Sequence, residues 1–156
     1  MWNEGYFTED TYTYGYYRDI SPFYQQYCLL THGYDVRITD ENTCHCELGY
    51  GQGVSVNIHA AAVPGHWVGT DFNPAHTSHA NLLCEAAQTD AQLWECSFAE
   101  MLERKNMPMF DSISLHGIWS WISQENQAHV VEFIRRYLKP GGIVYNSYNC
   151  FPGWRS

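Results

Sequence analysis

The residues with the clearest chemical potential are one acid and three glycines that recur at every second position. Glu47, Gly49, Gly51 and Gly53 follow a short apolar segment and precede a stretch whose composition suits a helix. Glycine lacks the Cβ that disfavours positive φ and blocks close contact. The pattern therefore predicts a strand that turns sharply into a helix while its backbone approaches a ligand. Several kinds of cofactor site share such a turn, so other residues of the sequence are needed to predict which ligand it binds.

Further chemical groups follow the later predicted strands. Asp71 ends the second strand, 18 positions after Gly53, where its carboxylate can accept hydrogen bonds from both hydroxyls of a ribose. The third strand is followed by an acid, a backbone N–H and an apolar ring that suit an adenine, within Glu95, Cys96, Ser97 and Phe98. His116 ends the fourth strand and is a candidate general base. Open α/β sheets bind ligands at the carboxyl ends of their strands, so these groups predict one site.

The elements that must position these groups follow from caps, breakers and periodicity. Ser21 and Pro22 predict a helix start, and Asn73-Pro74 and Ser123 predict two more. Expected helices cover 22–33, 54–62, 74–87, 98–104 and 123–138, and expected strands after the first cover 66–71, 91–95, 110–115 and 143–148. Alternating strands and helices predict an α/β fold, a Rossmann-like open and mostly parallel sheet with helices on both faces.

Each candidate residue also has a structural explanation. Asp71 could cap the next helix, although Asn73 is better placed, Glu95 could be a solvated surface acid, and His116 could bond to the backbone. Nicotinamide dehydrogenases share the glycine turn and the second-strand acid, but they commonly receive pyrophosphate on G-x-G-x-x-G. Here Glu47 precedes the glycines, and its carboxylate fits an ammonium group better than phosphates. The Tyr-x-x-x-Lys pair of short-chain dehydrogenases is also missing.

Composition limits the partners. The 156 residues, 45% hydrophobic and 16% charged, suit one globular domain. Seventeen acids against eight bases give a charge of −9, which argues against binding to nucleic acid or to an anionic membrane. The chain has no run of roughly 20 apolar residues and no signal-peptide pattern at its start, so we expect a cytoplasmic protein.

The Cys44-His45-Cys46 run raises the alternative of a metal site. On a strand, however, the two cysteines share one face and His45 lies on the other. The sequence has no second Cys or His pair at zinc spacing, so we expect core packing and no metal.

Five blocks of the sequence resemble class I S-adenosylmethionine-dependent methyltransferases. They are YGYY (14–17), ELGYGQG (47–53), GTDFNPAH (69–76), LHGIWSWIS (115–123) and SYNCFPGW (147–154). Together they are similar to the catalytic domain of bacterial methyltransferases that carry a methyltransferase regulatory domain. The resemblance implies S-adenosylmethionine as cofactor and S-adenosylhomocysteine as product.

The resemblance also implies roles for the candidate residues. The cofactor contacts would lie in the glycine block and directly after the second and third strands. These residues are Glu47, Gly49, Tyr50, Gly51, Gly53, Asp71, Phe72, Glu95, Cys96, Ser97 and Phe98. His116 would be the possible general base, with Trp119, Trp121 and Tyr148 as candidate walls of the acceptor site. The methyl acceptor stays open among a small molecule, a protein side chain and a glycan. Relatives of this architecture imply protein lysine methylation as one possibility.

We divide the chain into a Tyr-rich segment, residues 1–36, and a cofactor-binding core, residues 37–156. The first segment holds eight of the twelve tyrosines and is either a lid beside the cofactor or a set of rings that cover the sheet or an oligomer contact.

The class I sheet ends with a sixth and a seventh strand, whereas this sequence stops at Ser156, soon after the fifth. We therefore expect a truncated sheet whose fifth strand is an unprotected edge, suited to a homodimer. A second hypothesis follows: a module that binds the cofactor without catalysis, as a fragment or an assembly subunit.

Overall fold

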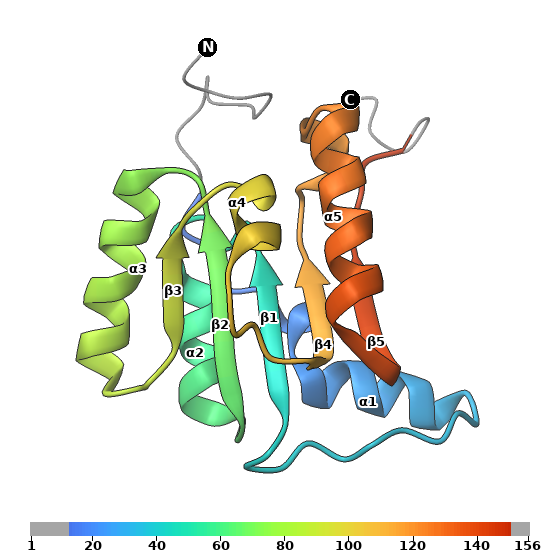
Figure 1. Ribbon diagram of the computed structural model, residues 1–156. Coiled ribbons are helices and arrows are strands. Elements are labelled where there is room, and N and C mark those ends of the chain that lie inside the picture. The colour runs from blue at the N-terminus through green and yellow to red at the C-terminus, as the bar shows by residue number, and fades with distance from the viewer. Residues whose placement is uncertain (1–12, 151–156) are drawn as a thin grey trace.

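The computed structural model describes residues 13–150, which form a five-stranded sheet in the order β3-β2-β1-β4-β5 (Figure 1). Every pair of neighbouring strands is parallel. The strands are β1 (Cys44–Leu48), β2 (His66–Asp71), β3 (Gln92–Glu95), β4 (Phe110–Leu115) and β5 (Leu138–Asn146). The α-helices are α1 (Pro22–Thr31), α2 (Val54–Ala62), α3 (Pro74–Ala87), α4 (Phe98–Glu103) and α5 (Gln124–Tyr137), with short 3-10 helices η1 (Arg18–Ile20) and η2 (Trp119–Trp121). This arrangement confirms the predicted Rossmann-like α/β fold.

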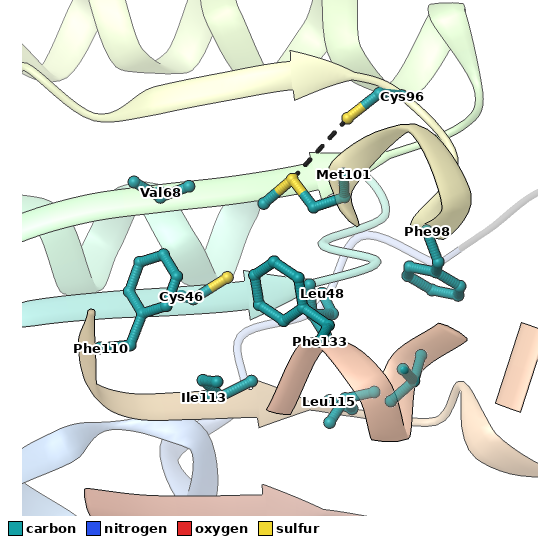
Figure 2. Close-up of a cluster of buried hydrophobic side chains, with 11 residues drawn as sticks. Cys46, Leu48, Val68, Cys96, Phe98, Met101, Phe110, Ile113, Leu115 and Phe133 are labelled. Atoms are coloured by element: carbon teal, nitrogen blue, oxygen red, sulfur yellow. Dashed lines mark hydrogen bonds between the residues drawn. The ribbon is translucent and has the colours of Figure 1, made fainter. Parts of the chain in front are cut away.

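Helices cover both faces of the sheet (Figure 1). On one face, α4 and α5 enclose the larger buried cluster, in which Phe133 and Met101 pack over the strands (Figure 2). On the other face, α2 and α3 enclose a second cluster around Val56 and Trp67. The small side chain of Ser114 accepts a hydrogen bond at 3.2 Å from Gln25 of α1, which fixes α1 against β4.

Local capping explains where most helices begin. The Asn73 side chain accepts a hydrogen bond at 2.9 Å from the N–H of Ala75, as predicted for the start of α3. Ser97 and Glu100 form a complete capping box at the start of α4. Ser123 caps α5 by accepting from the N–H of Asn126 at 3.2 Å. These caps place each helix directly after the strand or loop that carries a candidate residue.

Two expectations about element ends are wrong. The Ser21 side chain makes no capping hydrogen bond, although Pro22 does open α1. β5 begins at Leu138 and ends at Asn146, whereas a strand over 143–148 was predicted. Pro140, Gly141 and Gly142 lie within β5 at an irregular part of its pairing with β4. There the register shifts between Phe110 and Ser112 of β4. Pairing with β4 overrides the local stop signal.

The alternating faces of β1 agree with the sequence prediction. Cys46 lies in the cluster under α4 and α5, and Cys44 packs against the same cluster. The ring of His45 instead contacts Trp67 on the other face, at a centroid distance of 4.8 Å. Within residues 13–150 no group of three or more His, Cys, Asp and Glu side chains is placed to hold a metal ion.

Candidate active site

The glycine loop, residues 49–53, joins the carboxyl end of β1 to α2 and has the backbone that the sequence predicted. Gly49, Gly51 and Gly53 have φ values of +71°, +56° and +75°. A Cβ on Gly53 would clash with Ala80 of α3, and a Cβ on Gly49 would clash with Ile118. The positive φ values and, at Gly53, the contact with Ala80 therefore require glycine, whereas the end of the Ile118 side chain can move.

Asp71 fastens this loop to the end of β2. Its Oδ2 accepts a hydrogen bond at 2.9 Å from the N–H of Gly51. Its Oδ1 accepts from the N–H of Asn73 at 2.9 Å and lies 3.2 Å from Nδ1 of His76. The helix cap is Asn73, as expected, so Asp71 has a different role: it connects the two loops that follow β1 and β2.

Glu47 is a buried acid next to the glycine loop. Its side chain is 5% exposed, and burial together with the charge of Asp71 raises its pKa to about 8. No described residue gives its carboxylate a hydrogen bond or an opposite charge. A cationic ligand beside this acid would favour its ionised form, because an opposite charge offsets the loss of hydration of a buried carboxylate.

Tyr50 and Phe72 stand beside the loop in different surroundings. The Tyr50 hydroxyl lies 2.9 Å from Oγ1 of Thr77 and donates to the carbonyl of Trp94 at 3.2 Å, so its ring belongs to the core between the sheet and α3. Burial raises the pKa of this phenol. Phe72 is half-buried and packs against the cluster under α4 and α5. Their contacts with a cofactor stay predictions.

The segment after β3 is arranged mainly by its own helix. Cys96, Ser97 and Phe98 are buried, and Phe98 lies in the core cluster drawn in Figure 2. The N–H of Ser97 donates to the carboxylate of Glu100 at 2.8 Å, and the contacts of this segment with an adenine stay predictions. Glu95 is exposed at the end of β3, paired in register with Asp71. Of these four residues, Glu95 is the one whose side chain faces solvent.

His116 follows β4 at the same edge of the sheet and is half-buried. Its ring stacks on Tyr17 at a centroid distance of 3.9 Å, and its Nδ1 lies 3.2 Å from Oγ of Ser147. Burial lowers the pKa of His116 from its ordinary value near 6.5. The imidazole is therefore neutral at pH 7 and able to accept a proton.

Residues 13–17, which we name the N-terminal strap, contact both helix α2, which follows the glycine loop, and the ring of His116. Oγ of Ser55, in the first turn of α2, accepts from the N–H of Tyr17 at 2.8 Å and donates to the carbonyl of Gly15 at 3.3 Å. Nε2 of His59 lies 3.2 Å from the Tyr17 carbonyl. Sequence reasoning missed Ser55, His59 and Ser147, because no local pattern connects them to their distant partners.

The strap also meets the glycine loop through α3. The Tyr14 ring contacts His79 edge-on at 5.2 Å, and Nδ1 of His79 donates to the carbonyl of Gln52 at 2.7 Å. This position suits the predicted lid. The tyrosines at 6 and 12 lie outside the described residues, as does part of the SYNCFPGW block.

The three aromatic residues expected to form an acceptor wall have different exposures. Trp119 is half-buried against the cluster under α4 and α5, whereas Trp121 is 38% and Tyr148 62% exposed. Ile118, which sequence reasoning did not select, lies directly over Gly49. The loop after β4 therefore faces the glycine loop through an aliphatic side chain.

Residues 46–142 match a protein family described as a methyltransferase domain. The match covers more than half of the chain. The chain belongs to this methyltransferase family.

The methyltransferase domain is similar to solved structures. PKMT2 from Rickettsia typhi, in complex with AdoHcy, superposes with a TM-score of 0.80 and 26% sequence identity, over 92% of this chain and 28% of that chain. A SAM-dependent methyltransferase from Geobacter sulfurreducens, in complex with S-adenosyl-L-homocysteine, has a TM-score of 0.54 and 19% identity, over 67% and 41%. The second likeness concerns the fold alone. The fold is thus that of class I methyltransferases.

Curated relatives are longer than this methyltransferase domain. An uncharacterized protein of Synechocystis sp. is 41% identical over 155 residues, which are 98% of this chain and 30% of the relative. An uncharacterized protein of Rickettsia prowazekii is 31% identical over 116 residues, 73% of this chain and 21% of the relative. The chain spans less than a third of the length of these relatives.

Two cavities of the methyltransferase domain lie at the opposite edge, near the amino ends of the strands. The smaller, about 60 Å³, is lined by charges that neutralise one another: Asp111 pairs with Arg37 at 3.2 Å and with Lys139 at 2.7 Å. The larger, about 440 Å³, lies at the first residues of β1, β2 and β3. Neither contains a predicted site residue. No helix within residues 13–150 is long and apolar enough to cross a membrane.

Proposed function

We propose that this domain binds S-adenosylmethionine at the carboxyl edge of the sheet and transfers its methyl group to an O, N or S acceptor. The observation that carries the proposal is the glycine loop with Glu47 beside it, an acid that is buried and lacks a described partner. Two similar structures hold S-adenosylhomocysteine, which supports the choice of cofactor.

The residues present fit this cofactor. Glu47 binds the ammonium of the amino-acid end, because a cation there stabilises the ionised carboxylate. The glycine loop provides backbone contacts where Gly49 and Gly51 bring no side chain. Asp71 binds the ribose hydroxyls and keeps the Gly51 N–H in place. Phe72 and the 95–98 segment lie beside the adenine, with Glu95 as its polar neighbour.

His116 is the base in this proposal. S-adenosylmethionine, when bound, would supply an electrophilic methyl group, and alignment of the acceptor with it would provide most of the acceleration. His116 is neutral at pH 7 because burial lowers its pKa, and it accepts the proton that the acceptor loses. Trp119, Trp121 and Tyr148 form the wall against which the acceptor packs.

The test is transfer of labelled methyl from S-adenosylmethionine to acceptors in a cell lysate. The wild-type chain is compared with His116→Ala. Transfer that falls at least about 100-fold in the variant supports catalysis with His116 as base. Transfer that the variant retains in full would remove His116 from the mechanism.

The second candidate, a cofactor-binding module without catalysis, shares the glycine loop and Asp71. Its supporting observation is that the chain spans about 30% of its Synechocystis relative, so other parts of a longer protein could hold the acceptor. Binding of S-adenosylhomocysteine without methyl transfer from the wild type would favour it. The acceptor class and the cytoplasmic location stay predictions.

A further inference from the structure

We propose that Ser147 is a positioning residue for His116, whose hydroxyl holds Nδ1 of the imidazole so that Nε2 is the nitrogen that takes the proton of the acceptor. This inference rests on the proposed function, in which His116 is the general base. Ser147 opens the SYNCFPGW block, but no local pattern connects it to His116, which lies 31 positions away.

The backbone brings the two residues together. Leu115 of β4 pairs in register with Asn146 of β5, so the next residue of each strand, His116 and Ser147, leaves the sheet at the same place. The N–H of Ser147 donates to the carbonyl of Leu115 at 3.1 Å. Oγ of Ser147 accepts from the N–H of Gly117 at 2.8 Å, and it lies 3.2 Å from Nδ1 of His116. The hydroxyl is thus fixed by the loop that also carries His116.

The chemistry of a hydroxyl suits this role. Its oxygen has two lone pairs, of which the Gly117 N–H uses one, and the other is available to an Nδ1–H of His116. In that tautomer Nε2 carries no proton and is the basic nitrogen. When Nε2 takes the proton from the acceptor heteroatom, the Nδ1–H bond to Ser147 persists. The hydroxyl therefore stabilises the imidazolium, and Ser147 loses and gains no proton in the step.

Other groups also act on His116, and all of them remain when the hydroxyl is removed. Tyr17 stacks on the ring at 3.9 Å, and Tyr145 of β5 lies nearly parallel to it at 6.3 Å. Asp19 of η1 favours the charged imidazole, while burial disfavours it more strongly. Ser147→Ala removes both the contact with Nδ1 of His116 and the hydrogen bond from the Gly117 N–H, whereas Ser147→Thr retains a hydroxyl for both.

The chain offers a matched control. Oγ of Ser120 also connects the loop after β4 to the segment after β5: it accepts from the N–H of Asn149 at 2.8 Å. It makes no hydrogen bond to His116. Ser120→Ala therefore removes a hydroxyl from the same junction without touching the imidazole.

The test is NMR of the chain with isotope-labelled histidine, in which His116 is assigned from the signal that His116→Gln lacks. We expect Ser147→Ala to lower the pKa of His116 and to reduce its Nδ1–H tautomer, and Ser147→Thr to restore both. Ser120→Ala leaves both unchanged. A purely structural Ser147 predicts that the two alanine variants behave alike, and that result would overturn the inference.

Methyl transfer into cell-lysate acceptors gives the second readout. Ser147→Ala should lower transfer about tenfold at saturating S-adenosylmethionine, move the acidic limb of its pH profile to lower pH, and leave S-adenosylhomocysteine affinity unchanged. If His116→Ala keeps full transfer, the proposed function fails at its base, whatever Ser147 does. If His116→Ala loses transfer but Ser147→Ala keeps it, the positioning inference alone fails.

Discussion

At the scale of single residues, the site combines groups that need a ligand with groups that are satisfied within the chain. Asp71 has hydrogen bonds from two backbone N–H groups, so it stabilises the loops even in the free protein. Glu47 has no such described partner, and burial raises its pKa. A buried acid with a raised pKa and no opposite charge among the described residues is typical of a binding residue.

We predict that Glu47→Gln stabilises the free protein at neutral and basic pH. Burial, together with the charge of Asp71, raises the pKa of Glu47 from its ordinary value of 4.5 to about 8. The unfolded chain therefore releases this proton at lower pH than the folded chain, and stability falls as pH rises from about 4.5 to about 8. Gln does not titrate, so the variant should gain about 4 kcal/mol more at pH 8 than at pH 4.5. Urea unfolding at both values checks this, and an equal gain at both would contradict it.

The same acid predicts a proton linkage in binding. At pH 7 Glu47 is mostly protonated in the free chain, because its pKa is about 8. An ammonium group beside it favours the carboxylate, so cofactor binding should release a proton from Glu47. Titration calorimetry at pH 7 in two buffers of different ionisation enthalpy measures this release. Wild-type protein and Glu47→Gln should differ by a substantial fraction of one proton, and identical values would exclude the linkage.

At the scale of elements, the glycine loop depends on both backbone conformation and close packing. Gly53 and Gly33 both have positive φ, +75° and +81°. A Cβ on Gly53 meets α3 at Ala80, whereas a Cβ on Gly33 meets no atom within 4 Å. Substitution of Gly33 therefore tests backbone strain alone, whereas substitution of Gly53 tests backbone strain together with a steric clash.

We predict that Gly33→Ala costs about 1 kcal/mol of stability through left-handed backbone strain alone. Gly53→Ala should cost at least about 2 kcal/mol, because α3 must move as well. Thermal unfolding of both variants measures the difference. Equal losses would show that the contact with Ala80 does not limit this loop.

Element positions were largely predictable from the sequence because they depend on local signals. The Asn73-Pro74 start of α3 and the glycine loop hold in the structure. The start of β5 was not predictable, since Pro140 and two glycines read locally as a stop and only pairing with β4 shows otherwise. The Ser55 and Ser147 contacts were missed for the same reason: each joins segments about thirty or more positions apart.

At the scale of the whole molecule, the described sheet has an edge at β5, which pairs with β4. Val144 on this strand is 41% exposed. An edge strand presents backbone donors and acceptors that favour pairing with a second chain, so we propose that the chain forms a dimer through β5. The negative net charge of −9 opposes this association at low salt.

We predict that Val144→Lys weakens the dimer at least about tenfold, because a charge on an edge strand disfavours strand pairing. Val131→Lys is the matched control, since Val131 is 54% exposed and belongs to helix α5 rather than to the edge strand. Light scattering after size-exclusion chromatography, at 0.15 M salt and several protein concentrations, reports the masses. A monomeric wild type would rule out the dimer.

The most direct measurement of the central claim is calorimetric titration of the chain with S-adenosylmethionine and S-adenosylhomocysteine, with NAD as control. We expect micromolar binding of both sulfur cofactors and none of NAD. Asp71→Ala should abolish binding, and Glu47→Gln should weaken it at least about tenfold, while circular dichroism shows both variants folded. Absence of binding to the folded wild-type chain, or equal affinity in Glu47→Gln, would contradict the assignment of this edge as the cofactor site.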